Sequence, residues 1–511
     1  MAIEPNYEKV VSSERKKLGV TQSVIECRLP ADDANDVLKV LCANAKGFIL
    51  DSFVKNGEIE FSGNVNFQVI YENLSKEVNG LDYTADFKDK FLNSEISVGV
   101  VPVVTCSVID VNTAIMGKDV KVVAIVEVCV EVIKNTEVNA LTSVKGDNVY
   151  YNSDTLNISS FLGVLSNKFE STYDIEIKDN VERVLEVSCS PYLESVTPQN
   201  QFAKVVGGAN IDICYVSSGE EKLLRTHQTK VEFSEEVALD LLTENSCVQS
   251  LLNINNSLIK ITTNIDSDCA IVNLNIPYEY WGYAFNKTTL DIVDDVFSTD
   301  NFLKVNTTGF NSVCCGGHVN IENKVSGNVE SQEHSVDEVL GTCCNTVTLA
   351  TSFIEDGGLV LEGVASTTVL YLNKETNNTY SMVVEMPFSI NEKVGDLSDD
   401  FVPVVNLSLG EVGAKVRRGK DLEVVATLFV YADFYSDKID AVISNVDVLE
   451  EKPESESVLT IYIVKPNETI WEISKQLNIN PDSLLEQNPE VELPLIGGEK
   501  LIVYRQKEAL F

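Results

Sequence analysis

Residues 120–132 read VKVVAIVEVCVEV, with an apolar side chain at every second position. Lys121 and Glu127 fall between the apolar positions. Because the side chains of a β-strand point alternately to its two faces, a period of two predicts a half-buried antiparallel strand. The same alternation returns in residues 270–280 and 422–434. We therefore predict a mainly β protein built on long strands.

The three alternating stretches belong to a repeat. A glycine stands eight residues before a tyrosine in three strand-like runs, Gly63 to Tyr71, Gly207 to Tyr215 and Gly363 to Tyr371. Two further landmarks recur in the first and third copies, VPVV at 101–104 and 402–405 and GKD at 117–119 and 419–421. Landmarks that stay in register indicate one structural unit copied along the chain. We predict three β-rich repeat units, 22–144, 162–298 and 310–436.

Each unit is also expected to contain one short helix. The segments expected to be helical carry Val37-Leu38, Val184-Leu185 and Val339-Leu340, upstream of each glycine-to-tyrosine run.

Charge and proline mark the expected boundaries. Residues 450–457, EEKPESES, have the composition of a solvated linker. We place a linker at 437–457, so that residues 458–511 form a tethered C-terminal module. Residues 145–161 and 299–309 are the expected junctions between units, and 1–21 form an N-terminal segment.

The net charge of −39 restricts the partners, because Asp plus Glu number 78 and Lys plus Arg only 39. A surface this acidic repels phosphate backbones and anionic lipids, so nucleic acid and membrane surfaces are poor partners. The N-terminal residues lack the apolar core of a secretory signal, and no apolar run approaches the ~20 residues of a membrane span. We expect the twelve cysteines to be reduced thiols of an unexported protein.

Catalytic groups are scarce. The chain has three histidines and shows neither a Walker-type phosphate loop nor a dinucleotide fingerprint. The one cluster similar to a soft-metal site is Cys314, Cys315 and His318 with Cys343 and Cys344. Adjacent cysteines do not chelate a tetrahedral ion as a pair two residues apart does, so ordinary thiols are expected. We predict no enzyme activity, no metal and no cofactor.

The C-terminal module, 458–511, has the pattern strand, helix, helix, strand. In its first strand, Tyr462 and Val464 share one face, and Leu459, Ile461 and Ile463 share the other. Thr469 and Glu472 have the spacing of a capping box at the start of a helix. Asn480-Pro481 opens a second helix, and Leu501-Ile502-Val503 forms the closing strand.

This module resembles the LysM family. The matching positions, in order, are Tyr462, Val464, Thr469, Ile473, Leu484, Asn488, Pro489, Gly498 and Leu501. Family members bind glycans that contain N-acetylglucosamine or, in some cases, proteins. The resemblance places the glycan contacts in two loops, at Asn467, Glu468 and Thr469 and at Leu495, Ile496 and Gly497. The glycine and aspartate usual before the threonine are Asn467 and Glu468 here, so we expect weak binding of chitin oligomers.

A protein partner would use other residues of the module. Exposed aliphatic and tryptophan side chains are plausible anchors of a protein interface. We predict that Leu459, Ile461, Ile463 and Trp471 form such a binding face.

Three β-rich units followed by a LysM module resemble the SPOCS-domain spore coat morphogenetic proteins of clostridia. The resemblance implies a protein of the mother-cell cytoplasm that sits at the forespore surface, in the spore coat. It further implies that the LysM module binds a coat-basement ATPase of the SpoIVA type, while the repeats contact other coat proteins. The leading hypothesis is therefore a non-enzymatic adaptor. The alternative is a protein that binds peptidoglycan or cortex glycan through its LysM module. A cell-wall hydrolase would require a catalytic domain in the body, and the sequence indicates none.

Overall fold

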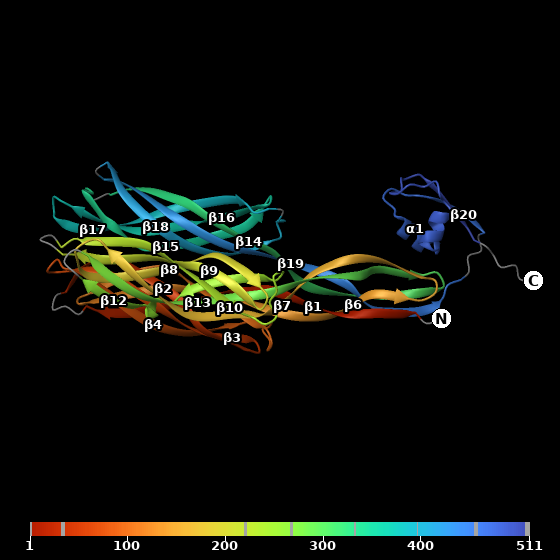
Figure 1. The fold of residues 1–511 in the computed structure, drawn as a ribbon, viewed down its shortest axis with the longest axis horizontal. Helices are drawn as coiled ribbons and strands as arrows, with labels where there is room; N and C mark the ends of the chain where they lie inside the picture. Colours follow the sequence, from red (N-terminus) through yellow and green to blue (C-terminus); the bar gives the residue numbers. More distant parts are fainter. Residues whose placement is uncertain are drawn as a thin grey trace, which may run out of the picture.

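The computed structural model describes residues 3–31, 36–218, 222–265, 269–331, 334–395, 397–418, 420–453 and 458–505. Figure 1 shows a wide β-rich body, a narrower extension made of strand ends, and the small C-terminal module beside the tip of that extension. The predicted mainly β class is confirmed.

Three units of similar layout make up the body. The first unit contains β1 (Glu4–Pro30), β2 (Val37–Lys55), β3 (Glu58–Asn73), β4 (Val78–Leu92), β5 (Val101–Met116) and β6 (Asp119–Lys145). The second contains β7 (Val149–Ile177), β8 (Val181–Gln199), β9 (Phe202–Ser217), β10 (Leu224–Ala238), β11 (Cys247–Ile254), a short 3₁₀ turn (Asn256–Leu258), β12 (Lys260–Ile265) and β13 (Ala270–Ser298). The third contains β14 (Asn301–Glu330), β15 (Glu338–Glu355), β16 (Gly358–Asn373), β17 (Asn378–Lys393), β18 (Val402–Arg418) and β19 (Asp421–Glu451).

Each unit is a sandwich of two antiparallel sheets. In the first unit the strand orders are β1-β6-β5 and β2-β3-β4, and the third unit repeats them as β14-β19-β18 and β15-β16-β17. The second unit has β10-β9-β8 facing a sheet in which β13 pairs with β7, β11 and β12. Apolar residues of both sheets form one hydrophobic core in each unit. The alternating stretches of the sequence lie in the central strands β6, β13 and β19, where the apolar positions are buried as predicted.

The repeated glycine has a packing role. Gly63, Gly207 and Gly363 each lie in the middle strand of the smaller sheet, opposite a β-bulge in the strand before it. A Cβ atom on Gly363 would lie 2.3 Å from the carbonyl oxygen of Thr348 and 2.6 Å from the ring of Phe388. Close approach of backbone and an aromatic ring leaves room for glycine alone.

The crowding at Gly363 predicts that Gly363→Ala destabilises the body. Overpacking a filled core costs about 1–3 kcal/mol, so the midpoint of thermal or urea unfolding should fall. Gly413→Ala is the matched control, because Gly413 also lies in a strand of the third unit and a Cβ there would meet no atom within 4 Å. Equal midpoints for the two variants would contradict this account of the repeated glycine.

The prediction of one short helix in each unit is wrong. Val37-Leu38, Val184-Leu185 and Val339-Leu340 lie in the strands β2, β8 and β15. β-bulges beside these pairs shift the register and break the period of two, so adjacent apolar residues mimic a helical pattern. In the described part of the body, the 3₁₀ turn in the second unit is the one helical segment.

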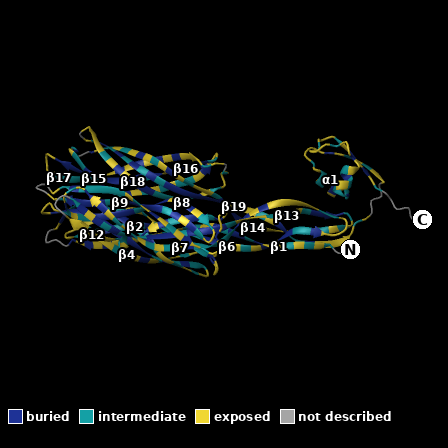
Figure 2. Ribbon diagram, viewed as in Figure 1, coloured by how far each residue is buried: buried dark blue, intermediate teal, exposed yellow. Residues whose placement is uncertain are grey.

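The three units surround a common axis. One apolar cluster combines residues of all three, among them Ile70, Cys214 and Leu370. A second cluster combines Ile133, Phe285 and Tyr435, and two more lie toward the outer ends of the long strand pairs β1–β6, β7–β13 and β14–β19. Figure 2 shows buried residues along these strand pairs. The sandwiches therefore bury a second set of apolar faces against one another.

The expected junctions and linker are largely strand. β7 and β14 begin at Val149 and Asn301, so the turns within 145–161 and 299–309 are limited to residues 146–148 and 299–300 and the rest is strand. The predicted linker, 437–457, is occupied by β19 as far as Glu451, and residues 454–457 lie outside the described residues. Residues 4–21 of the predicted N-terminal segment, 1–21, belong to β1, which pairs with β6 along its length, and residues 1 and 2 lie outside the described residues. The sequence is polar here because only the inward side chains at the ends of these strand pairs are buried around the axis.

Candidate functional site

The C-terminal module consists of β20 (Leu459–Ile463), α1 (Ile470–Leu477), α2 (Pro481–Glu486) and β21 (Lys500–Tyr504), as predicted. Its core contains Val464, Ile473, Leu484, Leu501 and Val503. The predicted capping box is present, since Thr469 accepts from the backbone N–H of Glu472 and the Glu472 carboxylate accepts from the Thr469 N–H. The helices thus cover one face of the two-stranded sheet.

The other face of this sheet is apolar and exposed. Leu459, Ile461 and Ile463 are 58%, 62% and 60% exposed. Leu459 pairs with Tyr504, and Ile461 pairs with Ile502, which extends the apolar surface across β21. We call these five residues the outer apolar face. Sequence reasoning missed Ile502 and Tyr504, although the alternation of 501–504 placed both opposite the buried Leu501 and Val503.

Trp471 lies apart from this face. It is carried by α1, on the helical side of the module, and is only partly exposed. Its indole Nε1 donates to Asp295 Oδ2 at 2.8 Å, and its ring packs edge-on against Phe297. Both partners belong to the end of β13 in the body. The structure therefore does not bring Trp471 together with Leu459, Ile461 and Ile463.

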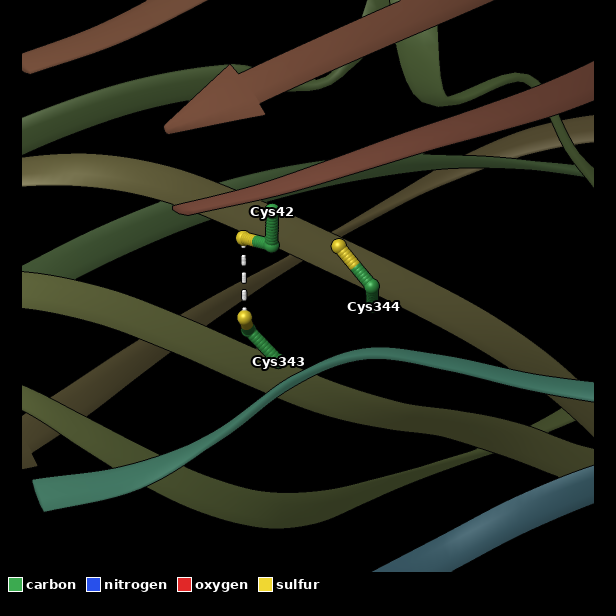
Figure 3. Close-up of side chains that lie close together, drawn as sticks. All are labelled: Cys42, Cys343 and Cys344. Atoms are coloured by element: carbon green, nitrogen blue, oxygen red, sulfur yellow. Dashed lines mark hydrogen bonds between the residues drawn. The ribbon is translucent and has the colours of Figure 1, made fainter. Parts of the chain in front are cut away.

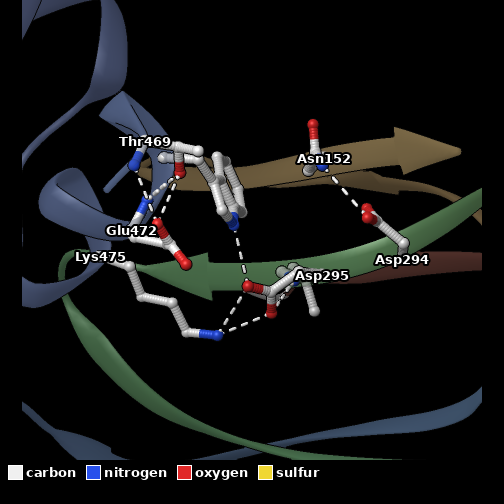
Figure 4. A network of polar contacts seen from close by, with 8 residues as sticks. Asn152, Asp294, Asp295, Thr469, Glu472 and Lys475 are labelled. Carbon is white, nitrogen blue, oxygen red and sulfur yellow. Dashed lines mark hydrogen bonds and ion pairs between the residues drawn. The ribbon is translucent and has the colours of Figure 1, made fainter. Parts of the chain in front are cut away.

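Further polar contacts attach the module to the body. Lys475 Nζ contacts both carboxylate oxygens of Asp295, at 2.6 and 2.8 Å (Figure 4). Asn478 Nδ2 donates to the carbonyl oxygen of Thr299 at 2.6 Å, and Lys452 Nζ donates to Asn478 Oδ1 at 2.7 Å. Although burial opposes the charge, the hydrogen bonds from Lys475 and Trp471 lower the pKa of Asp295. The expected free tether is thus corrected, because α1 is seated on the tip of β13.

The two predicted glycan loops lie side by side. A Cβ on Gly497 would lie 3.2 Å from the backbone nitrogen of Pro466, so the loop of 495–497 touches the turn before Asn467. Asn467 has a φ of 63°, which asparagine tolerates better than most residues. Ile496 is 68% exposed at the rim.

Carboxylates within these loops occupy some of the backbone donors. The N–H of Lys465 donates to Glu468 at 2.7 Å, and the N–H of Ile496 donates to Glu499 at 3.1 Å. The Lys465 N–H and the Tyr462 hydroxyl lower the pKa of Glu468, which favours its ionised, hydrogen-bonded form. A sugar that used these backbone groups would have to displace the carboxylates.

The structure separates the cysteines that the sequence grouped. Cys314, Cys315 and His318 lie on β14, where His318 stacks on Tyr431. A hydrogen bond from the Cys315 thiol lowers the pKa of Cys247 to about 6. Cys343 and Cys344 lie on β15 and meet Cys42 of the first unit, a neighbour that no local spacing reveals.

In the described part of the chain, neither α1 nor α2 has the length and apolar character needed to cross a membrane.

No curated protein and no solved structure matches this chain. Two protein families do match parts of it. Residues 36–116 match the family described as SipL, SPOCS domain, and residues 462–496 match the LysM domain. The SPOCS match covers β2 to β5 of the first unit, and the LysM match covers most of the C-terminal module. SPOCS and LysM domains together fit a sporulation-associated protein, and a LysM domain suggests peptidoglycan binding. The chain thus contains a SPOCS domain in its first unit and a LysM domain at its C-terminal end.

Proposed function

We propose that this protein is a non-enzymatic adaptor of the spore envelope. Its LysM module binds a protein partner, a coat-basement ATPase of the SpoIVA type, and its β-rich units contact other coat proteins. Its place is the mother-cell side of the forespore surface.

The outer apolar face carries this proposal. Five aliphatic and aromatic side chains on paired strands form one exposed patch, and each is between 48% and 62% exposed. Contiguous apolar surface of this kind marks protein interaction sites. Aliphatic and aromatic anchors in a flat patch suit a protein surface, whereas a glycan requires polar groups in the loops.

The alternative is peptidoglycan binding, which the LysM match favours. The loops of that site lie beside each other, so its general layout is present. Its backbone donors at Lys465 and Ile496, however, already bind Glu468 and Glu499. Breaking those charge-assisted hydrogen bonds would oppose sugar binding.

Isothermal titration of the full chain with chitotetraose separates the two functions. We expect dissociation constants of about 1 mM or higher, which corresponds to a binding free energy of about −4 kcal/mol or weaker. The same preparation should be retained by the immobilised coat-basement ATPase but not by insoluble peptidoglycan. Micromolar chitotetraose affinity together with peptidoglycan retention would make the glycan function the better one.

A further inference from the structure

Three cysteine thiols from two units meet on the common axis. Cys42 comes from β2 of the first unit, and Cys343 and Cys344 come from β15 of the third. Their Sγ atoms all lie within 4.8 Å of one another, and those of Cys42 and Cys343 are 2.8 Å apart (Figure 3). Two thiolates that share one tetrahedral metal, each with a metal–sulfur distance of about 2.3 Å, have their sulfur atoms roughly 3.8 Å apart. This separation lies between the 2.8 Å of the Cys42–Cys343 pair and the 4.8 Å limit of the group.

The second unit adds a carboxylate at the equivalent position. Cys42 pairs with Ile70, and Glu186 pairs with Cys214, in each case just after a β-bulge and opposite the residue before the repeated tyrosine. Cross-strand partners point to the same face of a sheet. Because Cys214 belongs to the axial cluster, Glu186 points toward that cluster too.

The Glu186 side chain has an unused acceptor. It is only 8% exposed, and within the described residues its Oε2 has no hydrogen-bond partner. It interacts electrostatically with the Cys344 and Cys42 thiols, although its oxygens are not among the ligand atoms that lie within 4.8 Å of one another. An unpaired buried carboxylate oxygen costs free energy unless something compensates for it, and a bound cation would do so.

The backbone at Cys344 is strained, and the strained conformation directs its thiol into the cluster. Cys344 has a φ of 54°, and the register of β15 against β16 shifts between Cys343 and Thr346. A left-handed conformation costs about 1–3 kcal/mol for a residue other than glycine. This bulge allows neighbouring residues of one strand to direct both thiols into the cluster, which an unbroken strand would point to opposite faces.

We propose that Cys42, Cys343 and Cys344 bind one thiophilic d¹⁰ metal ion on the axis where the three units meet. The three thiolates provide a trigonal set for copper(I), and zinc(II) would take a fourth ligand, for which Glu186 supplies a buried carboxylate. The half-buried side chain of Lys46 interacts electrostatically with Glu186 and Cys344 and, when protonated, offsets part of the negative charge, although burial lowers its pKa. The ion would join the first and third units through their thiolates.

Metal analysis of the full-length protein tests this site. The protein, purified without chelator, is incubated with zinc(II) or with copper(I) under reducing conditions and desalted, and its metal content is measured by mass spectrometry. We expect about one ion per chain. Cobalt(II) should give thiolate-to-metal absorption, which reports sulfur ligation independently of stoichiometry.

Variants assign the ligands. Cys42→Ser and Cys344→Ser should lose the bound ion, while Cys129→Ser, whose side chain lies outside the cluster, should keep it. Glu186→Gln keeps the shape of the side chain and all three thiols. If zinc takes its fourth ligand there, this variant should weaken zinc binding at least roughly tenfold while sparing copper(I).

Three results would overturn the proposal. The first is wild-type protein that holds no metal ion after incubation with either metal, while the thiols of Cys42, Cys343 and Cys344 can all be alkylated. The second is a disulfide between Cys42 and Cys343 in protein prepared under reducing conditions. The third is a metal content that the cysteine variants share with Cys129→Ser while circular dichroism shows them folded. If the cysteine variants fail to fold, wild-type stoichiometry and cobalt absorption still decide the matter.

Discussion

Replacing Ile461 by aspartate should reduce affinity for the protein partner by about 2–4 kcal/mol, or roughly 30- to 1,000-fold. Ile461 lies at the centre of the outer apolar face, between Leu459 and Ile463 and opposite Ile502. In a complex, its side chain would be desolvated, and an unpaired carboxylate there would be costly. Surface plasmon resonance with the immobilised coat-basement ATPase measures the change.

Ile496→Asp is the matched control. Ile496 has the same side chain and a similar exposure, but it lies in the loop that the glycan hypothesis assigns to sugar binding. We expect Ile496→Asp to leave the affinity for the protein partner within about twofold, because the substitution lies outside the outer apolar face. Both side chains lie outside the core of the module, so circular dichroism should show both variants folded. If Ile496→Asp lost more affinity for the protein partner than Ile461→Asp, the protein interface would lie in the loops instead.

Trp471 adds a condition to this experiment. Because its indole binds Asp295 and packs on Phe297, a partner that used Trp471 would first have to detach α1 from β13. A partner bound by the outer apolar face alone has no such requirement, since those side chains lie on the opposite side of the sheet.

Replacing Arg15 by methionine should lower the stability of the body by about 3 kcal/mol. The Arg15 side chain is 3% exposed and binds Glu131 through Nε and Nη2, at 2.8 and 2.7 Å. Its other guanidinium nitrogen donates to Gln249 of the second unit, and Tyr435 of the third unit lies 5.1 Å from the guanidinium. Methionine keeps the aliphatic length of the side chain but leaves the glutamate and the glutamine without their donor. The urea midpoint of the full chain, followed by tryptophan fluorescence, should fall.

Lys16→Met provides the comparison at the next position. Lys16 pairs with Glu95 at the surface, where both side chains are about half exposed. Surface ion pairs contribute about 0–1 kcal/mol, so the midpoint should change little. If Arg15→Met were as mild as Lys16→Met, the buried guanidinium would not hold the units together.

The sequence by itself determined the β class, the threefold repeat and the C-terminal module. These features depend on local rules: alternation reports strands, as in residues 120–132, and the Thr469 capping box fixes the start of a helix. The repeated glycines could be found in the sequence, but the reason why glycine is needed there could not. At Gly363 a Cβ atom would clash with the ring of Phe388, and equivalent phenylalanines of the following strand crowd the other two glycines.

Only the tertiary structure decided what happens where the units meet. Residues 145–161 and 299–309 look like junctions because alternate side chains are polar, yet three long strand pairs packed together bury the others. The same packing makes β2, β8 and β15 apolar on both faces and conceals their strand pattern. It also places Cys42 beside Cys343, Arg15 beside Tyr435, and Trp471 on Asp295. The members of these pairs lie more than a hundred residues apart, and local periodicity carries no information about contacts over that distance.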